Sequence, residues 1–294
     1  MKSKLTKPTS VAKEHIWIVT KYVGITEKKN IAFIDLSSEK IRKEVVPKSL
    51  RKQFLGGRGI NMHHLLHHIP PGIDPLSPKN ALLIGTGLLT GIPALGAGRC
   101  DIAAKSPLTG AVGDSNIGGF FAPELRFAGF DHLVITGKSD KPVYLWVHDG
   151  NIEILDAKYL WGKDTFDTQA QIRSDHNDEQ IKSLVIGEAG ENLVRYANVR
   201  TGMKNAAGRT GMGCVMGSKN LKAIAARGTM DLEFSFPDQL LDFCAEMNTQ
   251  VTKSRWGKAQ SKWGTLIIYS NTNTTGLIRT RNFQTNLLEN GENL

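Results

Sequence analysis

Glycine clusters are the feature that most restricts how this chain can fold. Many of its 30 glycines fall into short clusters, at residues 56–59, 85–91, 96–99, 106–110, 113–119 and 206–220. Glycine adopts positive φ and lets a ligand or another chain segment approach the backbone closely. Backbone N–H groups exposed in such loops also form concavities that bind anions. The clusters therefore indicate either many tight turns or a backbone surface that receives a ligand.

Two arginines, Arg99 and Arg209, lie inside or beside these clusters. A guanidinium group binds phosphate through paired hydrogen bonds. Turn chemistry alone would explain any single cluster, but several clusters with two arginines favour a site for a large anionic ligand. A P-loop is excluded, because the serine of Gly217-Ser218-Lys219 precedes the lysine. A Rossmann site is poorly supported, because no GxGxxG follows a strand, opens a helix and has an acidic residue at the required distance.

Composition is that of a soluble globular protein. The 294 residues are 40% hydrophobic and 22% charged, enough for one large domain or two smaller ones. No apolar stretch approaches the roughly 18 residues that span a bilayer, and the lysine-rich start lacks the features of a signal peptide. We therefore expect a cytoplasmic protein without a membrane partner. The net charge of +9 comes partly from residues 1–22, and no basic stripe interleaved with aromatic residues follows, which argues against nucleic acid.

Cysteine and histidine give little support for a metal site. Cys100, Cys214 and Cys244 are far apart and form no CxxC pair, so we expect reduced, mostly buried thiols. The run His63-His64-Leu65-Leu66-His67-His68 contains two i,i+4 histidine pairs, a spacing that can bind a metal on one helix face. No third ligand is recognisable nearby, so we interpret these histidines as a solvated flank. The opposite, apolar face would hold Met62, Leu65, Leu66 and Ile69.

Local patterns predict an α+β chain. Alternating residues 31–36 and the returning IRKEVV predict a hairpin, and a second one surrounds Gly150-Asn151. Further strands are predicted at residues 81–85, 99–105, 132–137, 183–187 and 221–227, and helices at residues 48–57 and 60–69. After Gly228 the pattern changes: Ser235-Phe236-Pro237-Asp238 resembles a helix start. A domain boundary is therefore expected near residues 229–235.

The same loops carry a family resemblance. GGRG, LLTG, SPLTG, GDSNIGGFFAPELRFAGFD, GKSDKPVYLWV, DAKYLWGKDT, IGEAGENLVR, AAGRTGMGCVMGSKNLKAIAARG and NFQT follow one another between roughly residues 25 and 285. In this order they resemble the tungsten-containing aldehyde:ferredoxin oxidoreductase family. The resemblance implies a basic flexible arm (1–24), an N-terminal pterin-binding domain of two β-sheets with a few helices (25–231), and the beginning of a helical second domain (232–294).

The resemblance also implies a cofactor and the residues that contact it. Family members oxidise aldehydes, pass electrons to ferredoxin, and hold tungsten, sometimes molybdenum, between two pterins. The matching cofactor-binding positions in this chain are Arg99, Asn116, Gly118, Ala206, Gly208 and Arg209. Leu88 stands where many members have proline. Asn205 occupies a position that is arginine in some members, and the loss of that guanidinium would weaken binding of the cofactor.

The chain does not contain every part that the family's chemistry requires. The family's [4Fe-4S] cysteines and the side chains beside the metal lie beyond the NFQT segment, so we expect no catalytic or metal-ligating residue in this chain. The isolated chain is then expected to be inactive unless a separately encoded C-terminal part completes it; a homodimer is also considered. The alternative is a non-catalytic pterin-binding remnant or carrier module. A third alternative, a basic nucleic-acid-binding protein, is weakly supported.

Overall fold

The first unit of the chain is built on a mixed six-stranded sheet, sheet A. The computed structural model describes residues 30–289 and 291, and the chain divides into two units, one ending at Pro237 and one beginning at Asp238. The predicted arm at residues 1–24 lies outside the described residues. Strands of sheet A run in the order β2-β1-β6-β3-β4-β5. Their bounds are β1 Asn30–Asp35, β2 Lys40–Val45, β3 Leu82–Thr86, β4 Cys100–Lys105, β5 Val112–Ile117 and β6 His132–Thr136.

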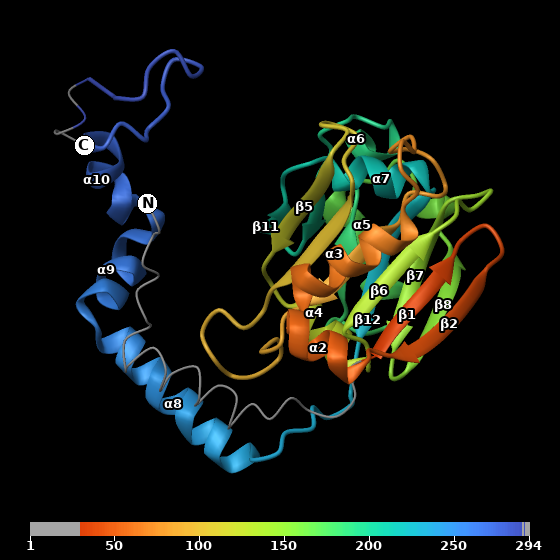
Figure 1. Ribbon diagram of the computed structural model, residues 1–294, viewed down its shortest axis with the longest axis horizontal. Coiled ribbons are helices and arrows are strands. Elements are labelled where there is room, and N and C mark those ends of the chain that lie inside the picture. The colour runs from red at the N-terminus through yellow and green to blue at the C-terminus, as the bar shows by residue number, and fades with distance from the viewer. Residues whose placement is uncertain (1–29, 290, 292–294) are drawn as a thin grey trace, which may run out of the picture. The chain divides into compact units, whose positions relative to one another are not determined.

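A second six-stranded sheet, sheet B, lies against sheet A (Figure 1). Its order is β11-β10-β9-β12-β7-β8. The strands are β7 Val143–His148, β8 Asn151–Asp156, β9 Lys182–Val185, β10 Val199–Thr201, β11 Asn205–Ala207 and β12 Leu221–Arg227. Each sheet has one parallel pair, β1 with β6 and β12 with β7, and its other pairs are antiparallel. Both predicted hairpins, β1–β2 and β7–β8, are confirmed.

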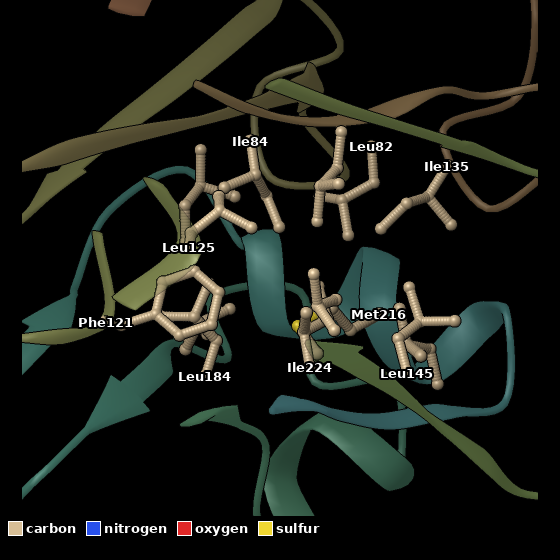
Figure 2. Close-up of a cluster of buried hydrophobic side chains, with 14 of the residues drawn as sticks. Leu82, Ile84, Phe121, Leu125, Ile135, Leu145, Leu184, Met216 and Ile224 are labelled. Atoms are coloured by element: carbon tan, nitrogen blue, oxygen red, sulfur yellow. The ribbon is translucent and has the colours of Figure 1, made fainter. Parts of the chain in front are cut away.

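The main hydrophobic core fills the space between the sheets (Figure 2). Leu82 and Ile84 of β3 point into it from sheet A, and Leu145 and Ile224 from sheet B. Two short helices enter the same layer: α4 (Phe121–Phe127) contributes Phe121 and Leu125, and α7 (Met212–Ser218) contributes Met216. Burial of one large aliphatic or aromatic side chain stabilises the folded state by about 1.5–3 kcal/mol. The two sheets are therefore joined by one continuous core.

Helices cover the outer faces of the sheets. The helices α2 (Lys48–Phe54) and α3 (Gly57–His68) pack on sheet A through a second core that includes Leu50, Ile60 and Leu65. The helix α5 (Thr165–Asp175), preceded by the turn η1 (Lys158–Leu160), covers sheet B through a third core around Ile172. Asp164 caps α5 by accepting hydrogen bonds from the N–H groups of Phe166 and Asp167. The two-sheet α+β architecture is confirmed.

One residue of the predicted face of α3 needs a correction. The spacing predicts Leu66 on the apolar face, but this residue is 80% exposed. The histidine flank is also not fully solvated: the rings of His64 and His68 lie 5.6 Å and 5.4 Å from the ring of Phe33 in β1. Burial lowers the pKa of His64 to about 4. Leu65, Met62 and Ile69 pack on the second core as predicted. Leu66 alone faces away, and the rings of His64 and His68 lie against Phe33 of the sheet.

Two glycine clusters that the sequence predicts to be loops contain regular secondary structure. Residues 113–119 include most of β5, and residues 206–220 include the buried helix α7. A four-residue helix, α6 (Glu188–Glu191), packs against α7. Part of the glycine pattern therefore serves packing between backbone segments.

The second unit is helical, as predicted. Its elements are α8 (Pro237–Lys253), α9 (Arg255–Trp263), η2 (Gly264–Ile268) and α10 (Tyr269–Thr274). Pro237 is the first residue of α8, and Ser254 caps α9 by accepting a hydrogen bond from the N–H of Gly257. Among the described residues, none of the helices has the length and apolar character of a membrane span.

Candidate functional site

The glycine loops meet at the end of β3, the beginning of β4 and the end of β5. A β-carbon at Gly56 would lie 3.1 Å from the carbonyl oxygen of Thr86, and one at Gly98 would lie 2.8 Å from the carbonyl oxygen of Gly119. The clusters at residues 56–59 and 96–99 therefore pack directly on the backbones of their neighbours. At Gly98 a side chain would separate the two loops, whereas at Gly56 it would shift the neighbouring backbone by a few tenths of an ångström.

Arg99 and Asn116 form a polar pair at this junction. The Nη1 of Arg99 donates a 2.5 Å hydrogen bond to the Oδ1 of Asn116. Both residues are exposed. Asn116 lies opposite Asp101 in the β4–β5 register, and cross-strand partners share a sheet face. The pair therefore lies on the outer face of sheet A, the face that α3 covers farther along β4.

Gly118 lies next to this pair. A β-carbon at Gly118 would lie 3.4 Å from the Oδ1 of Asn205 and 3.8 Å from the Cζ of Arg99. Asn205 comes from β11 of the other sheet, so the two sheets meet here. We call Arg99, Asn116, Gly118 and Asn205 the arginine–asparagine group. A side chain at Gly118 would occupy the space beside the guanidinium, which glycine leaves open.

The remaining predicted residues lie along the edge of β5. Ala206 is in β11, which lies beside β5, and Gly208 and Arg209 follow it. The backbone N–H of Arg209 donates to the Oγ of Ser115 (3.4 Å). The side chain of Arg99 is bonded to Asn116 and the backbone of Arg209 to Ser115, its neighbour in β5, and the side chain of Arg209 is exposed. Consecutive strand residues point to opposite faces, so these two bonds do not by themselves place both guanidinium groups on one face. The fold brings Arg99, Asn116 and Gly118 together and places Ala206, Gly208 and Arg209 along the edge of β5; a shared site and its contact with a cofactor stay predictions.

Arg126 holds the site loops in place, a role that the sequence reasoning missed. This residue of α4 is 8% exposed, and its Nε lies 3.1 Å from the Oδ1 of Asp131. Its Nη1 donates to the carbonyl oxygens of Leu88 and Thr90 in the 85–91 loop. The Oγ1 of Thr90 in turn donates to the carbonyl oxygen of Arg99 (3.0 Å). An arginine between apolar residues of a helix is the sequence signal that could have identified it.

A second buried polar group lies under the N-terminal half of α3. Asp101 is 2% exposed, and the Nδ2 of Asn61 donates to its backbone oxygen (3.1 Å) and to its Oδ2 (3.0 Å). His132 lies 3.3 Å from the Oδ1 of Asn61. A β-carbon at Gly85 would lie 2.5 Å from that same oxygen. Gly85 therefore makes room for this polar group and is not needed for a turn.

Burial raises the pKa of Asp101 to about 6, and the nearby Asp114 adds to the effect. The folded chain thus binds a proton here between about pH 4 and 6 while the unfolded chain does not. We expect the unfolding free energy of the wild type, relative to an Asp101→Asn variant, to rise by about 1–3 kcal/mol as pH falls from 7 to 4.5. Urea unfolding of both proteins at several pH values measures this difference; a constant difference contradicts it.

Metal-ligating side chains do not gather in the described part of the chain. Across residues 30–289 and 291, no three or more histidine, cysteine or acidic side chains form a group that could hold a metal. Cys100, Cys214 and Cys244 are free and buried, as predicted. Burial raises the pKa of the Cys100 thiol to about 12.

Comparison with known proteins gives consistent matches. A domain family described as "Aldehyde ferredoxin oxidoreductase, N-terminal domain" matches residues 31–228, more than half of the chain. The tungsten-containing aldehyde ferredoxin oxidoreductase of Pyrococcus furiosus is 42% identical over 256 residues, which cover 86% of this chain and 42% of that protein. The protein of the same name from Thermococcus kodakarensis is 40% identical over 260 residues, with 87% and 42% covered.

More distant matches carry other names. The aliphatic sulfonate oxidoreductase, WOR-like subunit, of Pyrococcus furiosus is 34% identical over 245 residues, covering 76% of this chain and 39% of that one. A solved structure of the active site complex BamBC of benzoyl coenzyme A reductase with 1,5 dienoyl-CoA has a TM-score of 0.75 and 37% identity. It covers 79% of this chain and 35% of that chain. The chain thus spans less than half the length of these relatives.

Proposed function

The chain belongs to the aldehyde ferredoxin oxidoreductase family, and from this premise we propose that it is the cytoplasmic pterin-binding part of an enzyme that oxidises aldehydes with ferredoxin as acceptor. The observation that carries the proposal is the exposed Arg99–Asn116 pair beside Gly118, on the strand that also anchors Arg209. A guanidinium group, an amide and uncovered backbone suit the phosphoryl groups of a pterin.

The residues present fit a phosphorylated pterin. Gly118 leaves space beside Arg99, and Gly208 has no atom within 4 Å of the position that a β-carbon would take. Asn205 replaces a guanidinium by an amide, which costs about 1–3 kcal/mol if a charge-assisted hydrogen bond is lost. Arg99, Asn116, Ala206, Gly208 and Arg209 would hold the ligand through side-chain and backbone donors. When bound, a tungsten or molybdenum bis-pterin supplies the two-electron redox chemistry.

The proposal assigns binding, and not catalysis, to this chain. Relatives have further sequence, because the chain spans only 42% of the tungsten-containing proteins that it matches. We propose that the residues beside the metal and the [4Fe-4S] ligands belong to that remaining length, on this or another polypeptide. This chain by itself would then orient the pterin without turning over aldehyde. The relatives' names include different substrates, and the aldehyde in this proposal comes from the family to which the chain belongs.

Pterin retention by a variant of Arg99 tests the proposal. The chain is produced in cells that make tungstopterin, together with a polypeptide carrying the remaining length of the family. Arg99→Ala is expected to retain at least tenfold less pterin than the wild type, because it removes the guanidinium at the phosphoryl group. The matched control is Arg173→Ala, an arginine of α5 that pairs with Glu179 on another part of the surface. Pterin is measured as its oxidised fluorescent derivative, and tungsten by mass spectrometry.

Equal retention by Arg99→Ala and the wild type would contradict the proposed site. Pterin retained without tungsten or aldehyde-dependent dye reduction, even in the presence of the remaining length, would favour the carrier alternative. Dye reduction by this chain alone would contradict the assignment of binding without catalysis.

A further inference from the structure

Arg58 lies at the start of α3, inside the glycine cluster 56–59, and the predicted site does not include it. Its Nε forms an ion pair with the Oδ2 of Asp114 and lies 3.7 Å from the Oδ1 of Asp101. The guanidinium side chain is nevertheless 65% exposed. Both contacts are made at Nε, but among the described residues neither Asp114 Oδ2 nor Asp101 Oδ1 accepts a hydrogen bond, so Arg58 is held by charge attraction. A guanidinium has five N–H donors, and those on the terminal nitrogens of Arg58 are available to a ligand on the exposed side.

The register of β4 and β5 places Arg58 on the same face as the arginine–asparagine group. Asp101 is opposite Asn116, and Asp114 precedes Asn116 by two residues, so all three side chains lie on one face. Arg58 contacts two of these residues, and Arg99 contacts the third. The anchor points on β5, Asp114 and Asn116, are about 7 Å apart along the strand. Two long guanidinium side chains can reach one ligand across that distance.

The residues around Arg58 are themselves fixed by the fold. Asp101 is buried, and the Nδ2 of Asn61 donates one hydrogen bond to its carboxylate and one to its backbone oxygen. The backbone before Arg58 is fixed as well, because Gly56 packs on Thr86 and Leu88. An exposed ion pair without such support contributes about 0–1 kcal/mol and leaves its side chains mobile. Here the acidic pair keeps a cation at a set position on the site face.

We propose that Arg58 is a second guanidinium of the proposed site and binds a phosphoryl group of the same ligand as Arg99. This inference rests on the proposed function. Asp101 and Asp114 act as positioning residues for Arg58. The N-terminus of α3, which has no side-chain cap, adds partial positive charge beside it.

Binding of inorganic pyrophosphate tests this without a loaded enzyme. Titration calorimetry on the full chain compares the wild type with Arg58→Ala, Arg58→Lys, Arg99→Ala and the control Arg173→Ala. We expect Arg58→Ala to weaken binding about tenfold or more, Arg58→Lys to weaken it less, and the control to bind as the wild type does. Wild-type affinity in Arg58→Ala together with weakened binding in Arg99→Ala overturns this inference alone. A wild type that binds no pyrophosphate overturns the proposed function as well.

An Asp114→Asn background separates binding by Arg58 from mere charge neutralisation. If Arg58 contacts the anion, Arg58→Ala still weakens pyrophosphate binding about tenfold when Asp114 is already Asn. If Arg58 serves only to neutralise Asp114, the substitution has little effect in that background, and the inference is wrong. Circular dichroism and urea midpoints of each variant establish that the compared proteins are folded.

Discussion

Lys222→Met is expected to destabilise the first unit by about 3–5 kcal/mol, because it leaves a buried carboxylate without its partner. The side chain of Lys222 in β12 is fully buried and that of Glu191 in α6 is 5% exposed, and the two form an ion pair. The Nζ of Lys222 also donates to the carbonyl oxygen of Lys163 (2.7 Å), and the N–H of Gly162 donates to the Oε2 of Glu191 (2.9 Å). The loss would be measured as the change in urea-unfolding free energy.

Two further variants make this result specific. Lys222→Met combined with Glu191→Leu removes both charges, so most of the lost stability should return. Lys141→Met breaks a surface pair with Asp156 (3.2 Å), in which both side chains are about half exposed, and should cost less than about 1 kcal/mol. If Lys222→Met costs no more than Lys141→Met, the buried pair does not have the energetic role that its burial indicates.

Gly217→Ala is expected to destabilise the fold by at least about 4 kcal/mol or to prevent soluble expression. A β-carbon at this position in α7 would lie 1.9 Å from the carbonyl oxygen of Gly190 in α6 and 2.7 Å from its carbonyl carbon. Both contacts are with backbone, so no flexible side chain can move aside. The expected result is a large fall in thermal midpoint or the absence of folded protein.

Gly208→Ala is the matched control for this substitution. Gly208 lies in the same glycine cluster, but no atom lies within 4 Å of the position that its β-carbon would take. We expect its unfolding free energy to stay within about 1 kcal/mol of the wild type. Similar stabilities of Gly217→Ala and Gly208→Ala would show that α6 and α7 can separate at little cost, against the packing described above.

These two glycines illustrate how far the sequence pattern reaches. The cluster at residues 206–220 correctly indicated a place where backbone is approached closely. It did not indicate which glycines are approached or by what. Gly217 contacts another helix, whereas the space beside Gly208 is open. The identity of a glycine is a local fact, but the atom that would collide with a β-carbon comes from a distant segment.

The arginines near the glycine loops differ in the same way. Arg58, Arg99 and Arg126 are all close to glycine loops in space, but the sequence reasoning selected only Arg99 with Arg209. Arg126 is buried and binds carbonyl oxygens of the 85–91 loop, while Arg58 is exposed and held by two carboxylates. Burial and partner charge distinguish the structural role of Arg126 from the binding role that we propose for Arg58, and neither is a property of one residue's neighbours in sequence.

The sequence by itself determined the α+β class, both hairpins, most of the long strands and the helical start at Pro237, because periodicity and turn residues act over a few positions. Tertiary structure alone decided the strand order, in which β1 pairs with β6 about a hundred residues later. It also decided the exposure of Leu66 and the packing of the glycine loops on one another at the ends of β3 and β5. These depend on the packing of two sheets through one core. Contacts between segments far apart in the chain leave no local signal that a single sequence can reveal.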